Sequence, residues 1–294
     1  MAFRGIYPPP ELIPAPCGVL SVARVTEYTA RSYDERWVRG FSFEYDSTPT
    51  TLELLTTNDA SVTGGELYDG SSDERYADYY PFHIEVEDLH STFGLPGEDR
   101  FDRVKKQLEV ATQKALELEL WDGPAAKAEF TTNPYLSKTG GATEAAAAGA
   151  YPAAEALFHL EQALANSPVG AAGVIHMTRD VASILGSRLV FVEDKDGKPS
   201  KAMTRLGTEV IIGMGYSGNG PVGTTNAAAS ASNRWMYGTG PVDVHLGKVE
   251  VINEDLGQGV NASINDMRIK AYRPAAVYFD PSVHYTVRVA VPTL

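Results

Sequence analysis

The chain has 294 residues, of which 43% are hydrophobic and 21% charged, as in an ordinary globular protein with a substantial core. Its single cysteine, Cys17, excludes an internal disulfide and a cysteine-based zinc site. The net charge is −13, with fifteen acidic residues and four arginines in residues 37–104, so the sequence offers no basic stripe for sequence-specific binding of nucleic acid.

Residues 1–36 show neither a helical nor a strand period, and five prolines precede Cys17. The prolines also interrupt the apolar helix that a signal peptide needs. No later stretch approaches the roughly 18 apolar residues of a membrane span. We therefore expect an extended N-terminal arm, synthesis in the cytoplasm and no membrane contact.

Alternating side chains predict two strands, at residues 37–45 and 82–87. The polar, acidic section between them has glycines and serines at the expected turns. These patterns predict a long protruding hairpin. In the second strand Glu85 and Glu87 fall on one face, where we expect water to solvate them.

Three helices are predicted next. The first follows Pro96 and ends before Gly123, with an apolar face of Phe101, Val104, Leu108, Ala111, Ala115 and Leu118. At about 24 residues, or roughly 36 Å, it is long for a globular domain and is typical of a structural rod. The second runs from Pro152 to Pro168 with Leu157, Leu160 and Leu164 on one face. The third has Thr178 as its cap, Val181, Ile184 and Leu185 inside, and Gly186 beyond its end.

From Arg188 onward the pattern predicts mostly strands. The expected strands are 189–193, 208–212, 235–237, 242–246, 248–252, 267–272, 276–279 and 284–291.

The segment after residue 205 decides between an enzyme and a structural protein. Gly213, Gly215 and Gly218 follow a β-branched run, as in a dinucleotide-binding loop. The residues that come next favour turns over the helix that such a loop requires, and the first acidic residue, Asp243, follows glycines and a proline. The sequence therefore favours a glycine-rich loop between strands. An oxidoreductase that uses this loop to bind a nucleotide cofactor stays as the least favoured of three hypotheses; the other two are given below.

The sequence shows no catalytic constellation. Its six histidines lack metal-ligand spacing, and no nucleophile elbow or phosphate loop is present. His176 and His245 lie in strand-like surroundings, which favours hydrogen-bonded structural roles. We expect no catalytic, metal-binding or cofactor-binding residue and no cofactor, and hence no enzyme.

Four segments carry a resemblance to a known family: KALELELWDGPAAK, GVIHMTRDVASILG, TRLGTEVIIGMGYSGNGPVG continuing to RWMYGTGPVDVHLG, and RIKAYRPAAVYFDPSVHYTVRV. Together with the order of arm, hairpin and long helix, they resemble the major capsid proteins of tailed double-stranded-DNA bacteriophages, in particular those of actinobacterial hosts. Encapsulin shells share this fold. The resemblance covers nearly the whole chain.

The resemblance implies an α+β fold, the phage major capsid fold, with an ordered series of parts. These are an N-terminal arm (1–36), an extended hairpin loop (37–82), a peripheral domain (83–150) with a spine helix (97–121), an axial domain (151–265), and C-terminal strands (266–294) that return to the peripheral and axial core.

Contacts with other copies are expected because a lone chain cannot offset the entropy that it loses when its arm and hairpin become ordered. Those parts span about 80 residues, and ordering the backbone of each residue costs on the order of 1 kcal/mol. The predicted subunit-interface residues are Tyr7, Trp37, Phe41, Phe43, Tyr45, Tyr68, Tyr79 and Tyr80. The predicted loop at the centre of a ring of subunits contains Gly213, Gly215, Tyr216, Gly218 and Gly220.

The resemblance further implies self-assembly into hexamers and pentamers that form an icosahedral head around phage DNA, without sequence-specific binding. The expected location is the virion, after assembly in the host cytoplasm. Expected partners are a separate scaffolding protein, a portal and decoration proteins. Some relatives cross-link through a lysine on the extended loop, but the first lysine here is Lys105, beyond that loop. An encapsulin-like shell that encloses an enzyme is the second hypothesis.

Overall fold

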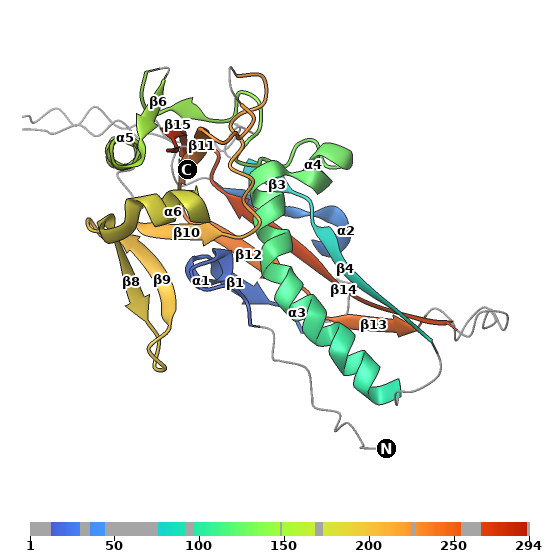
Figure 1. Ribbon diagram of the computed structural model, residues 1–294. Coiled ribbons are helices and arrows are strands. Elements are labelled where there is room, and N and C mark those ends of the chain that lie inside the picture. The colour runs from blue at the N-terminus through green and yellow to red at the C-terminus, as the bar shows by residue number, and fades with distance from the viewer. Residues whose placement is uncertain are drawn as a thin grey trace, which may run out of the picture.

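The computed structural model describes residues 13–29, 36–44, 76–91, 97–147, 149–167, 173–224, 227–253 and 266–292. Within these ranges, two sheets are joined by one long helix, α3, which runs past both (Figure 1). The fold is therefore α+β, as the sequence predicts.

The first sheet is built around the long strand β14 (Asp266–Phe279). One side of β14 pairs antiparallel with β4 (Phe82–Ser91). Its other side pairs antiparallel with β12 (Val242–Leu246) and β13 (Glu250–Asn253). β1 (Arg24–Glu27) completes the sheet by pairing parallel with β12.

The second sheet has eight strands and contains the middle of the chain. Its path runs β5, β15, β11, β7, β10, β9, β8, and β6 also pairs with β15. The bounds are β5 Thr143–Glu144, β6 Ala150–Pro152, β7 Val174–Thr178, β8 Leu189–Glu193, β9 Pro199–Thr204, β10 Glu209–Gly213, β11 Asn233–Thr239 and β15 His284–Ala290.

The central strands of the second sheet, β7, β10 and β11, are covered on both faces, which explains their near-continuous apolar sequences. On one face lie α5 (Ala153–Ala165) and α6 (Arg179–Leu185), which form a core with Ile175, Met177 and Met236. A short 3-10 helix, Gly186–Arg188, follows α6. On the other face, neighbouring strand residues pack with the C-terminal half of α3 in a second core that extends beneath the first sheet.

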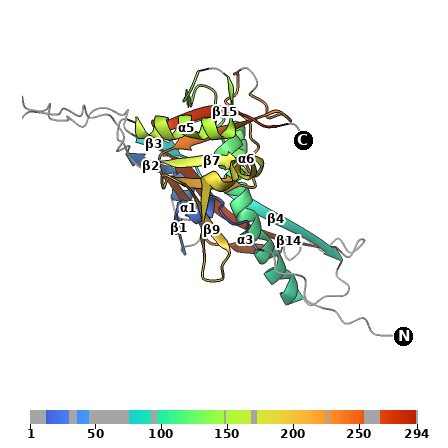
Figure 2. The same ribbon diagram turned by 60° about the vertical axis from the view of Figure 1, so that its left-hand side comes forward.

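The long helix α3 (Gly97–Asp122) has 26 residues, close to the predicted 97–121. Figures 1 and 2 show it lying along β4 and β14, with its C-terminal end against the second sheet. Val104, Leu108, Leu116, Leu120 and Trp121 are buried. Leu118, by contrast, is 41% exposed, so its predicted inward position is wrong. The buried face turns in the last third of the helix, where Glu117 and Glu119 are enclosed instead.

Short elements connect these layers. α1 (Val19–Val22) precedes β1, and α4 (Pro124–Ala128) follows α3. α2 (Arg36–Arg39) leads into β2 (Phe41–Glu44). The predicted strand therefore begins after Gly40 rather than at Trp37.

The base of the predicted hairpin is present as a separate two-stranded ribbon. β2 pairs antiparallel with β3 (Tyr76–Tyr79). The second strand predicted for the hairpin, 82–87, is therefore not the partner of β2; it lies within β4, which pairs with β14. Gly40, with φ of +91°, separates α2 from this ribbon. Residues 45–75 lie outside the described ranges, so the extent of the hairpin stays a prediction.

Several details differ from the sequence prediction. β12 and β13, assigned to the axial part 151–265, pair with β14 and so belong to the first sheet. The two strands expected at 267–272 and 276–279 form one continuous strand, β14. Strand β9 was not predicted at all, and Ile184, expected inside α6, is 42% exposed. Pairing partners far along the chain decide these features, and periodicity does not detect them.

The orientation of α3 can be tested with two leucines of the same helix. We expect Leu108→Ala to lower the free energy of unfolding by about 2–5 kcal/mol, because Leu108 is fully buried. Leu118→Ala, on the exposed side, should lower it by less than about 1 kcal/mol. Urea denaturation followed by circular dichroism measures both. Equal losses would show that the helix is rotated from the position described.

Candidate assembly surfaces

One buried carboxylate joins three distant parts of the chain. Glu117 of α3 is 0% exposed. Its Oε1 accepts a hydrogen bond from the Val19 backbone N–H at 3.1 Å. Its Oε2 accepts from the N–H groups of Met214 and Gly215, at 2.7 and 2.9 Å. Burial raises the pKa of the Glu117 carboxyl, and the three N–H groups together with the more distant charge of Arg179 oppose that rise.

The N-terminal segment is further fixed to the body of its own subunit. Gln113 Nε2 donates to the Ala15 carbonyl at 2.9 Å, Arg179 Nη2 donates to the Pro16 carbonyl at 3.0 Å, and the Ile212 N–H donates to the Cys17 carbonyl at 2.8 Å. Residues 15–27 are therefore an integral part of the fold. This corrects the prediction that the arm as a whole is poor in self-contacts.

The predicted ring-centre loop is also corrected. Gly213, Gly215, Tyr216, Gly218 and Gly220 are all buried. A Cβ on Gly215 would stand 2.5 Å from the Lys114 carbonyl oxygen, and one on Gly220 would meet the Trp235 ring at 2.1 Å. These glycines therefore allow close packing within the subunit instead of forming an open tip.

The same geometry removes the phosphate-binding interpretation of this loop. A dinucleotide loop must leave its backbone N–H groups free for a pyrophosphate. Here those of Met214 and Gly215 already donate to Glu117. β10 is followed by turns and irregular backbone through residue 224, without the required helix.

An aromatic cluster holds the base of the hairpin ribbon against the first sheet. Trp37 packs edge-on against Tyr28 and Phe41, with centroid distances of 5.6 and 5.3 Å. His245 of β12 lies between two tyrosines, with Nδ1 2.7 Å from Tyr28 Oη and Nε2 2.7 Å from Tyr278 Oη. Burial raises the pKa of Tyr278 to about 12, with a further rise from Asp243.

Two of the predicted interface residues are interior residues of the subunit. Tyr79 is 1% exposed and donates to the Phe279 carbonyl at 2.6 Å, and Trp37 is 6% exposed. Phe41 and Tyr80 are half-buried, and the backbone of Tyr80 is held on both sides by Asn133. Tyr7, Tyr45 and Tyr68 lie outside the described residues, as does the side chain of Phe43.

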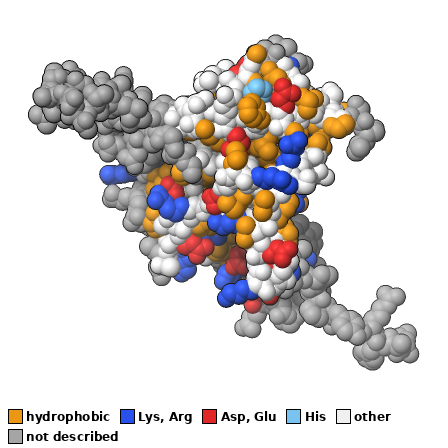
Figure 3. Space-filling model, turned by 90° about the vertical axis from the view of Figure 1, so that its left-hand side faces the viewer, with side chains coloured by type: hydrophobic (Ala, Val, Ile, Leu, Met, Phe, Trp, Pro, Cys, Tyr) orange, Lys and Arg blue, Asp and Glu red, His pale blue; other side chains and the backbone are white. Residues whose placement is uncertain are grey.

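Exposed apolar side chains gather on the side of the second sheet formed by β8, β9, α5 and α6. They are Phe158, Ile184, Val190, Phe191, Val192 and Leu206. Figure 3 shows this side, with hydrophobic side chains lying among lysines and arginines. A monomeric protein seldom leaves such a group exposed, so this surface is a candidate contact with another molecule.

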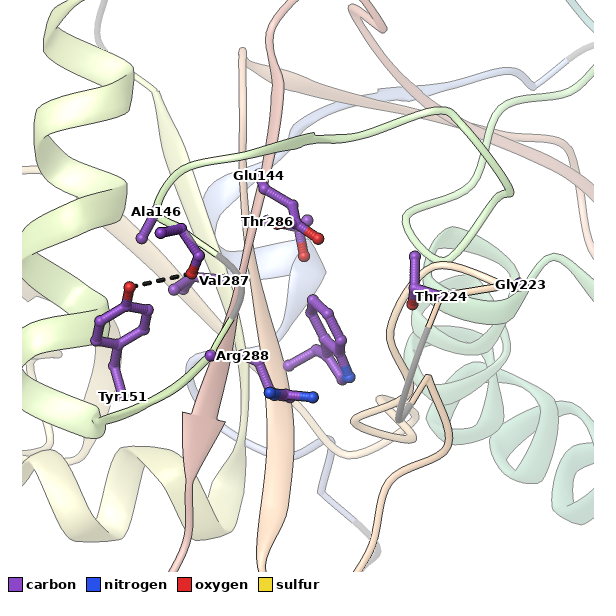
Figure 4. A pocket seen from close by; sticks show the side chains of 11 residues that line it. Glu144, Ala146, Tyr151, Gly223, Thr224, Thr286, Val287 and Arg288 are labelled. Atoms are coloured by element: carbon purple, nitrogen blue, oxygen red, sulfur yellow. Dashed lines mark hydrogen bonds between the residues drawn. The ribbon is translucent and has the colours of Figure 1, made fainter.

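A groove lies within this apolar surface, between α5 and the turn after β9. Its volume is about 190 Å³, and its lining includes Leu157, Phe158, Arg188, Arg205 and Leu206. A larger recess, of about 520 Å³, lies beside β15 and the segment 144–151. Figure 4 shows Tyr151 closing one side of this recess, where its hydroxyl donates to the Ala147 carbonyl at 3.0 Å.

Two glutamates and a histidine singled out in the sequence have partners within the described residues. Glu85 and Glu87, expected to be only solvated, face cations of β14: Lys270 lies 3.1 Å from Glu85, and Arg268 lies 2.9 Å from Glu87. His176 is held between Tyr216 Oη at 2.9 Å and Thr239 Oγ1 at 2.8 Å. Burial lowers the pKa of His176 to about 3 and that of His284 to about 4, so both are neutral near pH 7.

The described ranges contain neither a cluster of metal ligands nor a helix that could span a membrane. Three or more His, Cys, Asp or Glu side chains never come together there in a way that could hold a metal ion. Among the same residues, every helix is too short or too polar to cross a membrane.

The fold is similar to that of several solved capsid and encapsulin structures. The capsid of the empty GTA particle matches with a TM-score of 0.58 and 14% identity, over 99% of this chain and 95% of that chain. A structure of Gordonia phage Cozz gives 0.52 and 12%, over 99% and 92%. The holo-SrpI encapsulin complex of Synechococcus elongatus gives 0.50 and 11%, over 98% and 93%. No protein-family model matches the sequence, and neither does any curated protein.

The chain therefore has the fold shared by phage capsids and encapsulins, which confirms the fold that the resemblance implied. The match extends along nearly the full length of both partners. At these identities, the likeness establishes the fold and leaves function to be proposed.

The Glu117 junction can be tested by truncating its carboxylate. We expect Glu117→Ala to lower the free energy of unfolding by about 3 kcal/mol or more, because three backbone N–H groups lose their acceptor at about 1–3 kcal/mol each. The matched control is Glu109→Ala, on the exposed side of the same helix. Hydrogen exchange should also show faster exchange at Val19, Met214 and Gly215. Unchanged exchange there would contradict the junction.

The buried histidines predict a loss of stability in mild acid. Their pKa values in the folded chain lie below the ordinary value of 6.5. The unfolded chain therefore binds more protons below pH 6.5, and the free energy of unfolding should fall as the pH drops from 6.5 toward 4, by up to about 1.4 kcal/mol per pH unit for each histidine.

The raised pKa of Glu117 acts in the opposite direction, so we compare slopes between variants. Denaturation of His176→Gln between pH 4.5 and 6.5 should show a slope reduced by about one proton, and His284→Gln should behave in the same way. If the slope stays at the wild-type value in both variants, the two histidines are not the groups responsible.

Proposed function

We propose that this chain is the major capsid protein of a tailed bacteriophage, which assembles with its own copies into hexamers and pentamers that form an icosahedral shell around double-stranded DNA. One observation carries the proposal: the capsid of the GTA particle aligns with 99% of this chain and 95% of its own.

The exposed surface of the subunit supports assembly. Phe158, Phe191 and Leu206 keep 60%, 45% and 80% of their surface in contact with solvent. Apolar surface of this kind gains free energy when a second molecule covers it. A copy of the same chain is the partner that a shell supplies.

The hairpin is proposed to reach across a neighbouring copy. Its base is fixed by Trp37 and Tyr79, which belong to the core of their own subunit. The residues beyond this base, with Tyr45 and Tyr68, are proposed to contact the neighbour, and Tyr7 in the first part of the arm is proposed to do the same. The proposed parts of the subunit are the arm 1–36, the hairpin 37–82, the peripheral domain 83–150, the axial domain 151–265 and the returning strands 266–294. Strands β12 and β13 fall within 151–265, but they pair with β14 in the first sheet.

The proposed location is the virion, after synthesis and assembly in the host cytoplasm. A net charge of −13 suits a container that encloses DNA without gripping it. A separate scaffolding protein, a portal and decoration proteins are the further proposed partners. The proposed role is structural, without catalysis, cofactor or membrane contact.

An encapsulin-like compartment is the second candidate, and the likeness to the SrpI encapsulin favours it. Purified particles distinguish the two. A phage capsid protein should form shells without a protein cargo and, with its scaffold and packaging partners, enclose DNA. An encapsulin should retain an enzyme when it is expressed in its native host.

Assembly itself is the direct test. We expect the expressed chain, alone or with its scaffold, to form closed particles or rings of six in electron micrographs. We expect a chain in which a four-residue linker of glycine and serine replaces residues 46–74 to keep the near-ultraviolet circular dichroism of wild type. The reason is that Trp37 and Tyr79 anchor the hairpin base in the core of the subunit. The replacement should abolish closed particles. A wild-type chain that remains a monomer at all concentrations would overturn the proposed function, and assembly by the shortened chain would overturn the role of the hairpin.

A further inference from the structure

The strand β8 has an unusual surface for the edge of a sheet. It lies at one end of the second sheet and pairs with β9 on one side. Val190, Phe191 and Val192 are 47%, 45% and 42% exposed, so both faces of the strand carry apolar side chains in contact with water. Natural edge strands are normally protected by charges, bulges or a covering element. In β8 the pairing register shifts only after Val192, and the charged Glu193 follows it, so the apolar run itself is left for another molecule to cover.

The apolar groove described above supplies a complementary surface. Its walls are α5, through Leu157 and Phe158, and the turn after β9, through Leu206. Its rim carries Arg188 and Arg205. Glu161 also lines the groove: its Oε2 accepts from Thr208 Oγ1 at 2.7 Å, while its Oε1 is buried and has no hydrogen-bond partner among the described residues. The groove thus lacks both an apolar occupant and a donor for one oxygen.

A subunit cannot fill its own groove with its own strand. The groove lies at the base of the β8–β9 hairpin, because Arg188 immediately precedes β8 and Leu206 follows β9. Phe191 lies three residues further along a paired strand, roughly 10 Å away from that base at 3.3 Å per residue. Figure 1 shows β8 and β9 projecting away from α5 and α6. The strand and the groove therefore suit two different copies of the chain.

The charges beside strand β8 and beside the groove are of opposite sign. The apolar run of β8 ends at Glu193, which is exposed and forms no ion pair within the described residues. The groove offers Arg188, which is likewise exposed, and Arg205, whose Nε donates to the Ser187 carbonyl and leaves its other nitrogens available. An acidic residue beside an apolar strand thus matches arginines beside an apolar groove.

We propose that the β8–β9 hairpin of one copy docks in the groove of the next, with Phe191 between Phe158 and Leu206 and with Glu193 near Arg188 and Arg205. The inference rests on the proposed function, since it assigns the contact that holds neighbouring subunits of one ring. The contact joins two different surfaces, so it is a head-to-tail interface, the type that forms a ring when the rotation between copies closes.

Cross-linking between two single-cysteine additions tests this arrangement. Phe191→Cys and Leu206→Cys chains are assembled separately and as a mixture and then treated with a short bismaleimide. Cys17 is 3% exposed and serves as the internal background. We expect cross-linked dimers in the mixture and not in either variant alone, and a ladder of higher multimers from a chain carrying both changes.

The matched control pairs Phe191→Cys with Ile252→Cys, an apolar residue of similar exposure, 44%, in the other sheet. This pair should give no cross-link. Cross-linking of Phe191→Cys with itself would show that two β8 strands meet symmetrically, and it would overturn the head-to-tail contact. Assembled particles with no cross-link in the mixture would also overturn it.

Charge substitution separates this inference from the proposed function. We expect Phe191→Glu and Leu206→Glu each to lower the yield of particles at least about tenfold, which corresponds to about 1.4 kcal/mol per contact, while the circular dichroism of the subunit is retained. Ile252→Glu should assemble like wild type. If wild type assembles and both variants assemble equally well, the docking contact is wrong and the shell function stands. If wild type never assembles, the shell function itself is wrong.

Discussion

The structure depends on one enclosed carboxylate, that of Glu117 on the long helix. Among the residues that the structure describes, no cation forms an ion pair with it. A charged group taken out of water is strongly destabilising unless hydrogen bonds replace its hydration. Glu117 has three such bonds, and they come from both the N-terminal segment and the loop after β10. The helix therefore connects the two sheets only when both of these segments are in place. Tyr216 and Trp121, whose ring centroids lie 4.5 Å apart, pack beside the same loop.

The distribution of polarity in the subunit is unlike that of a typical monomer. Glu117, Glu119 and Arg273 are buried inside, where backbone groups form hydrogen bonds with them, and the buried His176 is held by the side chains of Tyr216 and Thr239. Phenylalanine, leucine and valine side chains of the second sheet remain in solvent. A monomer would be more stable with its apolar side chains buried and its charged side chains in water. A subunit whose final environment is a shell has its apolar surface covered later, so the polar contacts inside give it a defined shape before that happens.

The sequence predicted those parts whose pattern is local. The apolar period of α3, the leucine face of α5 and the short strands Leu189–Glu193 and Val242–Leu246 were visible without partners. Glu117 and Glu119 could not be identified as buried, because a glutamate on a helix ordinarily faces water. Aromatic residues at the hairpin base were assigned to an interface, and loop glycines to the centre of a ring of subunits. Both are internal, because segments about 100 to 200 residues away along the chain complete their packing.

The Glu117 junction also sets an order in time during synthesis. Val19 and Gly215 each lie 98 positions from their shared acceptor, one before it and one after. On the ribosome, the early segment must wait for the helix, and the helix for the loop, before either can settle. Contacts this distant along a chain close slowly and late. A nascent polypeptide of this design thus stays unfinished until residue 215 has emerged from the ribosome.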